Sequence, residues 1–267
     1  MSKAIALGIT GVAVSFAMLA AGFVAGNRSD LNAAPYGAGE AQPSLASAVS
    51  RSDVEAIVRD YLLQNPEILT DMQAELEDRQ REEQRLALLD AIGNSSDAIF
   101  NAAYDGVVGN PQGSTTVVEF FDYNCGFCKR AYDDMAALVA DDSDLRFVLK
   151  EFPILGPDSQ KAHIVSMAFR TLAPEKYGDF HRTLLMGGRA TEATAIAAAL
   201  ALGVDEAALR EEMKNPAIAD AFNETYELAQ QLAITGTPSY VVGQEVVFGA
   251  LGKAVLKEKV ELARAQN

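Results

Sequence analysis

Short runs of β-branched and aromatic residues mark the expected strands of the chain, and apolar residues at the 3.6-residue repeat mark the expected helices. Thr115–Phe121 is a β-branched and aromatic run that predicts a buried strand. Residues 129–139 carry a helical pattern, and 145–150 predict the next strand. A strand, a helix and a second strand at this spacing predict a right-handed crossover unit with parallel strands.

Helical patterns fill residues 158–233, where prolines and glycines separate the segments. The expected helices cover 161–172, 175–185, 191–202, 205–213 and 217–233. A strand follows Thr237-Pro238, and a two-residue turn returns the chain as a hairpin partner at 245–248. Residues 252–264 form a closing amphipathic helix. We therefore expect an α/β protein in which a helical block interrupts the strands.

Two further helices precede this domain. A capping signal at Ser52 opens the first, and Pro66 starts the second, which is expected to run to Ile92. The apolar residues of the second helix recur at Leu69, Met72 and Leu76 and again at Leu86 and Leu89, with Arg79 and Glu83 between them. A long helix with such an interrupted apolar stripe either folds back on the domain or pairs with other copies of the chain.

The N-terminus has the pattern of an export signal. After Lys3, residues 4–25 carry no charge, and Arg28 follows them. This stretch is long enough to tether the chain to a membrane, or it is cut off as a signal peptide, and both outcomes export the rest of the chain. The expected parts are a signal peptide or anchor at 1–26, a disordered linker at 27–50, a helical N-terminal region at 51–92, and a domain at 93–267 with its helical insertion at about 158–233.

Composition and charge narrow the classes of function. Hydrophobic residues make up 49% of the 267 residues, which is ample for a core. The formal net charge of −15 argues against a nucleic acid partner, because binding to a phosphate backbone depends on a basic surface.

The chain has two cysteines, Cys125 and Cys128, at the predicted junction of a strand and a helix. At a helix N-terminus the free N–H groups and the helix dipole favour a thiolate at the first cysteine. A thiolate is the nucleophile in thiol–disulfide exchange, and a second cysteine one turn later can release a trapped mixed disulfide. In an exported compartment disulfides persist, so an isolated pair of this kind favours disulfide chemistry.

Two other roles of the cysteine pair remain open at this point. A purely structural disulfide would close a very short loop and would stabilise the fold weakly. A zinc site needs about four ligands, and His163 and His181 lack the spacing of a zinc finger. We expect both histidines to be ordinary residues of a helix surface or of the core.

The segment EFFDYNCGFCK at 119–129 closely resembles the active-site segment of the DsbA-like family of exported disulfide oxidoreductases. Residues 58–69 are similar to the N-terminal domain of the ScsC branch, which is linked to copper tolerance. The resemblance covers about 53–265. It implies a thioredoxin-like fold with an inserted helical domain, preceded by an N-terminal helical segment. It further implies that 53–92 joins copies into a homo-oligomer and that the protein acts as a disulfide isomerase.

The resemblance also implies roles for five residues. Cys125 resembles the nucleophile of the family and Cys128 resembles its resolving thiol. Thr237-Pro238 resembles the cis-proline loop, which lies against the cysteines and pairs with the substrate backbone. Glu119 resembles a buried acid that relays a proton to the resolving cysteine, a task suited to a carboxyl group with a raised pKa. Beyond the redox-active Cys125–Cys128 disulfide, the resemblance implies no cofactor and no metal.

One feature of the active-site segment departs from the strongly oxidising members of the family. Gly126-Phe127 stands where those members have Pro-His, whose histidine helps to stabilise the thiolate. The pair resembles the Gly-Tyr of isomerases and reductants. Lys150 is a further, weaker candidate for tuning the site.

The leading prediction is therefore an exported, isomerase-like oxidoreductase. Its expected partners are proteins with thiols or disulfides and a membrane redox partner that reduces or oxidises it. Two alternatives are a net dithiol oxidase and a Cu(I)-binding protein that uses the same thiols, which are soft ligands.

Overall fold

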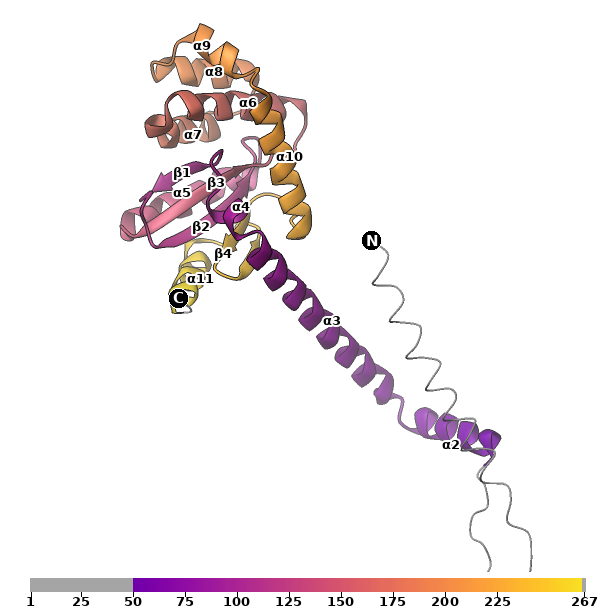
Figure 1. Cartoon of the computed structure of the whole chain (residues 1–267). Coiled ribbons are helices and arrows are strands. Elements are labelled where there is room, and N and C mark those ends of the chain that lie inside the picture. The colour runs from indigo at the N-terminus through magenta and orange to yellow at the C-terminus, as the bar shows by residue number, and fades with distance from the viewer. Residues whose placement is uncertain (1–49, 266–267) are drawn as a thin grey trace, which may run out of the picture. The chain divides into compact units, whose positions relative to one another are not determined.

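The computed structural model describes residues 50–265, and the part of it from Glu67 onward is built around a five-stranded mixed sheet (Figure 1). The strands are β1 (Gly106–Gly109), β2 (Thr115–Phe121), β3 (Leu145–Glu151), β4 (Ser239–Val242) and β5 (Glu245–Phe248). Their order across the sheet is β1-β3-β2-β4-β5. β2 and β3 run parallel, with Thr115 opposite Leu145, and β4 and β5 form an antiparallel hairpin. The predicted crossover unit and the predicted hairpin are confirmed.

Helices cover both faces of the sheet. The elements on one face are α5 (Gly126–Asp141), α7 (Tyr177–Met186) and α11 (Lys253–Ala265). The elements on the other face are the end of α3 (Glu67–Asn94), α4 (Ser96–Phe100) and α10 (Pro216–Gln231). Val117 and Phe121 of β2 point into the first core, and Val118 and Phe120 point into the second. A strand buried on both faces is largely apolar, which explains the run of valines and phenylalanines in β2, and Glu119 is its buried exception.

The helical block predicted at about 158–233 is confirmed. Its elements are α6 (Pro157–Leu172), η1 (Pro174–Lys176), α7, α8 (Glu192–Ala201), α9 (Glu206–Glu212) and α10. α6 begins four residues before the predicted start at 161, because proline suits the first turn of a helix. Figure 1 shows α6 to α9 stacked on the side of the sheet that carries β1, with α10 running back alongside the sheet, and α7 packs against β1.

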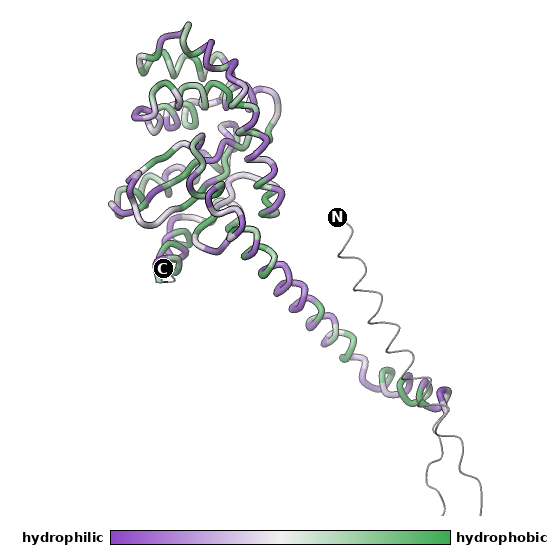
Figure 2. The backbone as a smooth tube through the Cα atoms, viewed as in Figure 1, coloured by the Kyte–Doolittle hydropathy of each residue, from purple (hydrophilic) through white to green (hydrophobic). Residues whose placement is uncertain are grey.

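The chain divides into two compact units, with the boundary between Pro66 and Glu67. The described part of the first unit contains α2 (Arg51–Gln64), none of whose residues is buried. Its cap is Ser50, two residues before the predicted Ser52, and Asp53 completes a capping box there. In the second unit α3 starts one residue after the predicted position and ends at Asn94. Figure 2 shows polar residues along the middle of α3, whereas Ile92 near its end lies in the core.

Within residues 50–265, none of the helices combines the length and the apolar character needed to cross a membrane. The predicted export segment at 1–26 and all but the last residue of the predicted linker at 27–50 lie outside the described residues. The membrane tether through 4–25 stays a prediction.

A glycine in β1 tests the packing of the sheet against α7. A Cβ atom on Gly106 would lie 1.9 Å from Cε1 of the buried Tyr177 side chain. Gly106→Ala is therefore expected to lower the free energy of unfolding by about 3 kcal/mol, because the ring cannot move within a packed core.

The neighbouring Gly178 supplies the control for this prediction. Its Cβ atom would meet Val108 at 3.8 Å, an ordinary contact, so Gly178→Ala should change the stability by less than about 1 kcal/mol. Urea denaturation of both variants measures the difference. Equal stabilities would contradict the packing at this interface.

Candidate active site

The two cysteines lie where β2 passes into α5, as predicted. Cys125 is the N-cap residue of α5, with φ of −75° and ψ of 115°, and Cys128 lies in the first turn. The carbonyl of Asp122 accepts the Cys125 N–H at 2.9 Å, and the Lys129 N–H donates to the Cys125 carbonyl at 3.1 Å. Both thiols are free. Cys125 is 6% exposed and Cys128 is 0% exposed, so the first thiol is the accessible one.

The environments of the two thiols shift their pKa values in opposite directions. A hydrogen bond with the Cys128 side chain lowers the pKa of Cys125 to about 5, and the Thr237 side chain and the N–H groups of Phe127 and Cys128 add to the effect against the opposing influence of burial. Burial raises the pKa of Cys128 far above the ordinary thiol value, and the hydrogen bond to Cys125 and the charge of Glu119 reinforce the shift. At neutral pH the pair therefore holds one thiolate, on Cys125.

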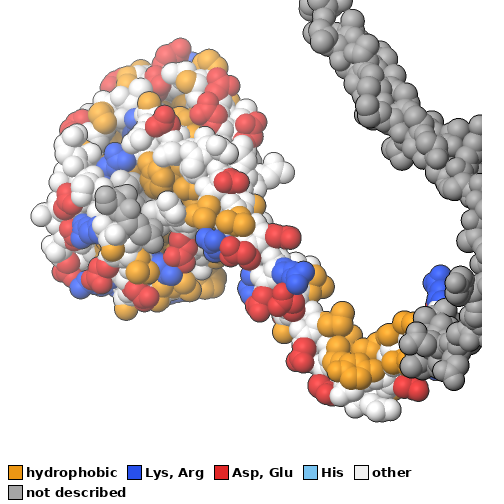
Figure 3. Space-filling view, turned by 60° about the horizontal axis from the view of Figure 1, so that its bottom comes forward, with side chains coloured by type: hydrophobic (Ala, Val, Ile, Leu, Met, Phe, Trp, Pro, Cys, Tyr) orange, Lys and Arg blue, Asp and Glu red, His pale blue; other side chains and the backbone are white. Residues whose placement is uncertain are grey.

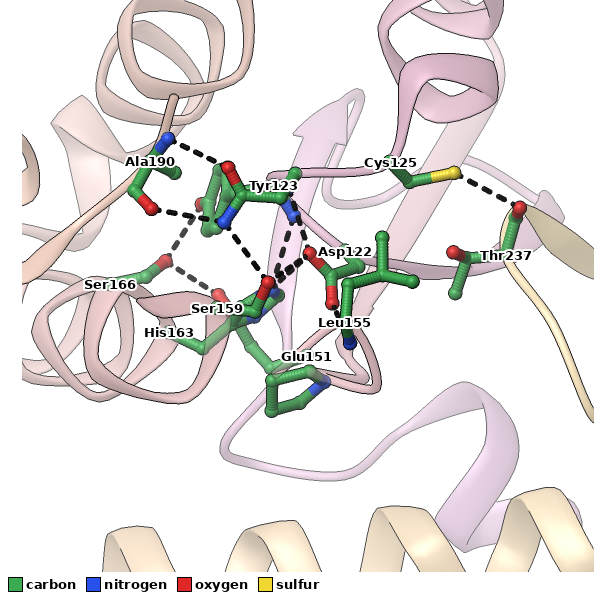
Figure 4. Close-up of polar contacts among 12 residues, drawn as sticks. Asp122, Tyr123, Cys125, Glu151, Leu155, Ser159, His163, Ser166, Ala190 and Thr237 are labelled. Carbon is green, nitrogen blue, oxygen red and sulfur yellow. Dashed lines mark hydrogen bonds and ion pairs between the residues drawn. The ribbon is translucent and has the colours of Figure 1, made fainter. Parts of the chain in front are cut away.

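The predicted cis-proline loop lies against the cysteines. The Thr237–Pro238 peptide bond is cis. The Cys125 thiol donates a hydrogen bond to the Thr237 carbonyl, with 3.1 Å between the two atoms (Figure 4). Because Ser239 pairs with Phe120 of β2, the start of β4 is fixed beside the strand that leads to Cys125. The structure thus brings Cys125 and Thr237-Pro238 together.

Glu119 is buried in the middle of the sheet, with only 4% of its surface exposed. It stands opposite Leu149 on β3 and Tyr240 on β4. Burial, with a smaller contribution from the charge of Cys125, raises the pKa of Glu119 to about 8. The predicted burial is confirmed, and the role in proton relay stays a prediction.

Lys150 does not belong to the cysteine site, and the expectation that it tunes that site is wrong. It stands opposite Phe120 in the parallel register, so its side chain faces the second core and not the core of Glu119. There its Nζ donates to Asp105 at 2.5 Å and to the Ala98 carbonyl at 2.5 Å. Lys150 therefore forms a buried ion pair on the opposite face of the sheet.

A buried polar network behind the active-site turn was missed by sequence reasoning. His163 is completely buried, binds Glu151 through Nδ1, and accepts the Tyr123 N–H on Nε2 at 3.2 Å. Tyr177 and Ser166 also donate to Glu151, at 3.0 and 2.5 Å. Both histidines lie in the core, one of the two expected positions, because His181 is 1% exposed. No local pattern marks this network, because its members come from four separate segments.

The turn itself is held by two polar residues that the sequence reasoning did not single out. The carboxylate of Asp122 accepts the Asn124 N–H and the Ser159 hydroxyl, both at 2.8 Å. The side chain of Asn124 reaches the backbone of Ala190 in the helical block. Both residues flank Tyr123 in the segment between β2 and Cys125.

A metal site would need about three or four ligands close together. Across residues 50–265 the structure brings together no group of three His, Cys, Asp or Glu side chains that could hold a metal ion. The two thiols remain the soft ligands available at the turn.

Known proteins resemble both parts of the chain. The sequence profile of the DSBA-like thioredoxin domain matches residues 116–261, and that of the copper resistance protein ScsC N-terminal domain matches 51–83. A thioredoxin-like oxidoreductase from Silicibacter pomeroyi DSS-3 is 39% identical, with a TM-score of 0.60 over 63% of this chain and 97% of that one.

Two further solved structures are similar. The thiol-disulfide exchange protein alpha-DsbA2 from Wolbachia pipientis is 30% identical, with a TM-score of 0.62 over 67% of this chain and 97% of that one. ScsC from Proteus mirabilis, in a transitional conformation, is 25% identical, with a TM-score of 0.61 over 85% of this chain and 100% of that one. The second of these likenesses extends into the N-terminal helices.

The raised pKa of Glu119 predicts a pH dependence of stability. The folded pKa is about 8 and the unfolded value is near 4.5, so between these values the unfolded state releases a proton that the folded state keeps. The folded state therefore loses stability as the pH rises through this window, by up to about 1.4 kcal/mol per pH unit. Glu119→Gln should remove this loss and make the variant more stable than the parent at pH 8.

Urea denaturation at pH 4 and pH 8 measures the effect. Both proteins are kept in the disulfide form so that the cysteines do not titrate. A stability difference between parent and variant that is the same at both pH values would show that Glu119 is ionised in the folded protein across the window.

Proposed function

The chain belongs to the family of DSBA-like thioredoxin domains and is a thiol–disulfide oxidoreductase of that type, and we propose that it acts as an exported protein disulfide isomerase. The observation that carries the proposal is the Cys125 thiol, whose pKa near 5 makes it a thiolate at neutral pH. Cys125 lies at the start of α5, beside the Thr237 carbonyl. A bound substrate therefore finds the Cys125 sulfur for its disulfide and the Thr237 carbonyl for its backbone.

The reaction begins at Cys125. The thiolate attacks one sulfur of a substrate disulfide, the substrate S–S bond breaks, and the other substrate sulfur leaves as a thiolate. The Thr237 carbonyl accepts a hydrogen bond from the Cys125 thiol, which the thiolate cannot donate. Ionisation of Cys125 therefore frees that carbonyl to accept an N–H from the backbone of the bound substrate.

Isomerisation follows without any net oxidation. The released substrate thiolate attacks a second disulfide of the same substrate, and a later substrate thiolate attacks the mixed disulfide at Cys125. Each step breaks one S–S bond and forms one. The enzyme returns to its starting state with Cys125 as the thiolate.

Cys128 rescues a complex that stalls. Its pKa is raised by burial, so it needs a base before it can attack. Glu119 takes that proton in its carboxylate form, which acts on Cys128 through its charge. The mixed disulfide removes the Cys125 charge, which helps to hold the pKa of Glu119 at about 8, so the carboxylate form becomes more populated at neutral pH. The Cys128 thiolate then attacks Cys125, the internal disulfide forms, and the substrate leaves reduced. A membrane redox partner must return the disulfide to the dithiol.

The N-terminal helices supply the proposed oligomer. The exposed apolar side chains of α2 are Val54, Ile57, Val58, Tyr61, Leu62 and Leu63, and those of α3 are Leu69, Met72, Leu76 and Leu86. Figure 3 shows hydrophobic side chains at the surface of the N-terminal helical segment. The similarity of 51–83 to the ScsC N-terminal domain supports an interface within 53–92 that joins copies of this chain.

A net oxidase is the second candidate function. The lowered pKa of Cys125 stabilises the dithiol relative to the disulfide, and a pair stabilised in this way is a better oxidant. The exposed Phe127 supplies no imidazole to add to that stabilisation, and this favours the isomerase. We propose the same location for either activity: the periplasm or another extracytoplasmic compartment, with 4–25 as the leader or tether.

Reactivation of scrambled ribonuclease tests the isomerase. The chain without residues 1–26, in a glutathione buffer, is expected to restore ribonuclease activity, and Cys125→Ser is expected to lose the effect completely, because serine cannot form the mixed disulfide. Cys128→Ser should retain part of the activity and accumulate mixed disulfides.

Oxidation of a reduced peptide without any reactivation would favour the oxidase. Absence of both activities would contradict the exchange mechanism, and a Cu(I) titration of the parent and of Cys125→Ser would then test the thiols as metal ligands.

A charged substitution tests the oligomer. Leu62→Glu on α2 should dissociate the oligomer and lower the reactivation rate by about tenfold, because linked active sites raise each other's effective concentration at one substrate. Leu262→Glu on α11 is the matched control, since the two leucines are 44% and 46% exposed.

Sedimentation velocity and the ribonuclease assay give the two readouts. A Leu62→Glu variant that sediments as the parent does would exclude this face of α2 from the interface.

A further inference from the structure

Asn124, the residue immediately before Cys125, joins the active-site turn to the helical block. Its Nδ2 donates to the Ala190 carbonyl at 2.9 Å, and its Oδ1 accepts the Ala190 N–H at 2.9 Å. The side chain therefore pairs with both polar backbone groups of one residue. Nδ2 also donates to the Ser159 hydroxyl at 3.0 Å.

Asp122 secures the other end of the same turn. Its buried carboxylate accepts the Leu155 N–H at 3.0 Å in addition to the Asn124 N–H and the Ser159 hydroxyl. Burial alone would raise the pKa of Asp122, but hydrogen bonds with His163, Asn124 and Ser159 hold it below the ordinary value. The carboxylate is thus a charged acceptor around which the turn is organised.

A second contact ties the same segment of the helical block to the turn. Lys129, in the first part of α5, donates through Nζ to the Gly188 carbonyl. Gly188 and Ala190 both precede α8, so this segment contacts the turn on either side of the cysteines. Figure 4 shows Ala190 and Thr237 on opposite sides of Cys125.

We propose that Asn124 is a positioning residue for disulfide exchange, which holds the Cys125 sulfur between the start of α5 and the Thr237 carbonyl by fixing the turn on Ala190. The proposal rests on the exchange reaction described above. Cys125 itself is held by two backbone hydrogen bonds, to Asp122 and from Lys129, and both belong to the turn or to α5. Only side-chain contacts anchor this turn to the helical block, and Asn124 makes the two that reach Ala190.

The physical consequence concerns the donors that stabilise the thiolate. The N–H groups of Phe127 and Cys128 and the Cys128 thiol must all point at one sulfur atom. A turn that moves relative to the rest of the domain carries Cys125 away from the fixed Thr237 and admits water to the thiolate. The pKa of Cys125 then rises toward that of a free thiol.

The test compares two asparagines that make similar bonds. Asn124→Ala is expected to raise the pKa of Cys125 by about one unit and to slow its alkylation about tenfold at a pH below both values. Asn110→Ala is the matched control. Asn110 is also half-buried and bonds two backbone groups, the Ser143 carbonyl and the Gln112 N–H, both at 2.9 Å, but it lies at the turn before β2. The Asn110→Ala substitution should lower the unfolding midpoint and leave the pKa of Cys125 unchanged.

The pH dependence of iodoacetamide alkylation and the ultraviolet absorbance of the thiolate give the pKa independently of any exchange activity. Ser159→Ala removes one partner of Asn124 and one of Asp122 and keeps the Ala190 pair, so it is expected to give a smaller shift. If Asn124→Ala does not fold, an unchanged Cys125 pKa in Ser159→Ala would contradict the proposal. A lowered unfolding midpoint with an unchanged Cys125 pKa would overturn the proposal. A parent protein that titrates near pH 5 but rearranges no disulfides would contradict the proposed function, and the effect of Asn124 on the thiol would still be measured.

Discussion

The short connection between β2 and α5 is the constraint on which the site depends. It must leave a buried strand, satisfy its own backbone groups, and present a cysteine at the first turn of a helix. Asp122 meets the first two demands by accepting three hydrogen bonds on its carboxylate and one on its carbonyl. The third follows, because the chain that leaves this turn begins α5 at Gly126 and so makes Cys125 the cap. The thiol then faces free helical N–H groups, which is the physical reason for its ionisation.

Burial and hydrogen bonding decide which of three ionisable groups in this core is charged: Cys125, Cys128 or Glu119. Cys125 has donors within reach, so its charged form is favoured although it is largely covered. Cys128 and Glu119 are covered without comparable donors, so their neutral forms are favoured. A thiolate beside two protonated groups is the arrangement that exchange requires, because the nucleophile stays ready while the resolving thiol waits for a base. One physical cause, the loss of water, thus keeps both Cys128 and Glu119 protonated beside the Cys125 thiolate.

Most of the fold could be predicted from the chain because its signals are local. A continuous β-branched and aromatic run marks β2, period-3.6 patterns mark the helices, and the cysteine spacing marks the junction between β2 and α5. The prediction for Lys150 was wrong because the face of the sheet on which its side chain lies depends on the register between β2 and β3, which no local pattern fixes. The contact of Asn124 with Ala190 joins residues 66 positions apart, and His163 meets Glu151 across two elements. Such pairings appear only when the folded chain brings separate segments together.

The direction of catalysis depends on more than the acidity of one thiol. A low pKa at Cys125 serves an oxidase, because it stabilises the dithiol, and it serves an isomerase equally, because it supplies the attacking thiolate. The two activities differ in the number of steps at one substrate. An oxidase transfers its disulfide once and leaves, so a single site suffices. An isomerase must meet several disulfides of one misfolded chain, and linked sites raise the effective concentration of nucleophile around it. Exposed apolar faces on α2 and α3 are therefore of use to an isomerase and superfluous to an oxidase, and this favours the isomerase for a chain that combines them with Cys125.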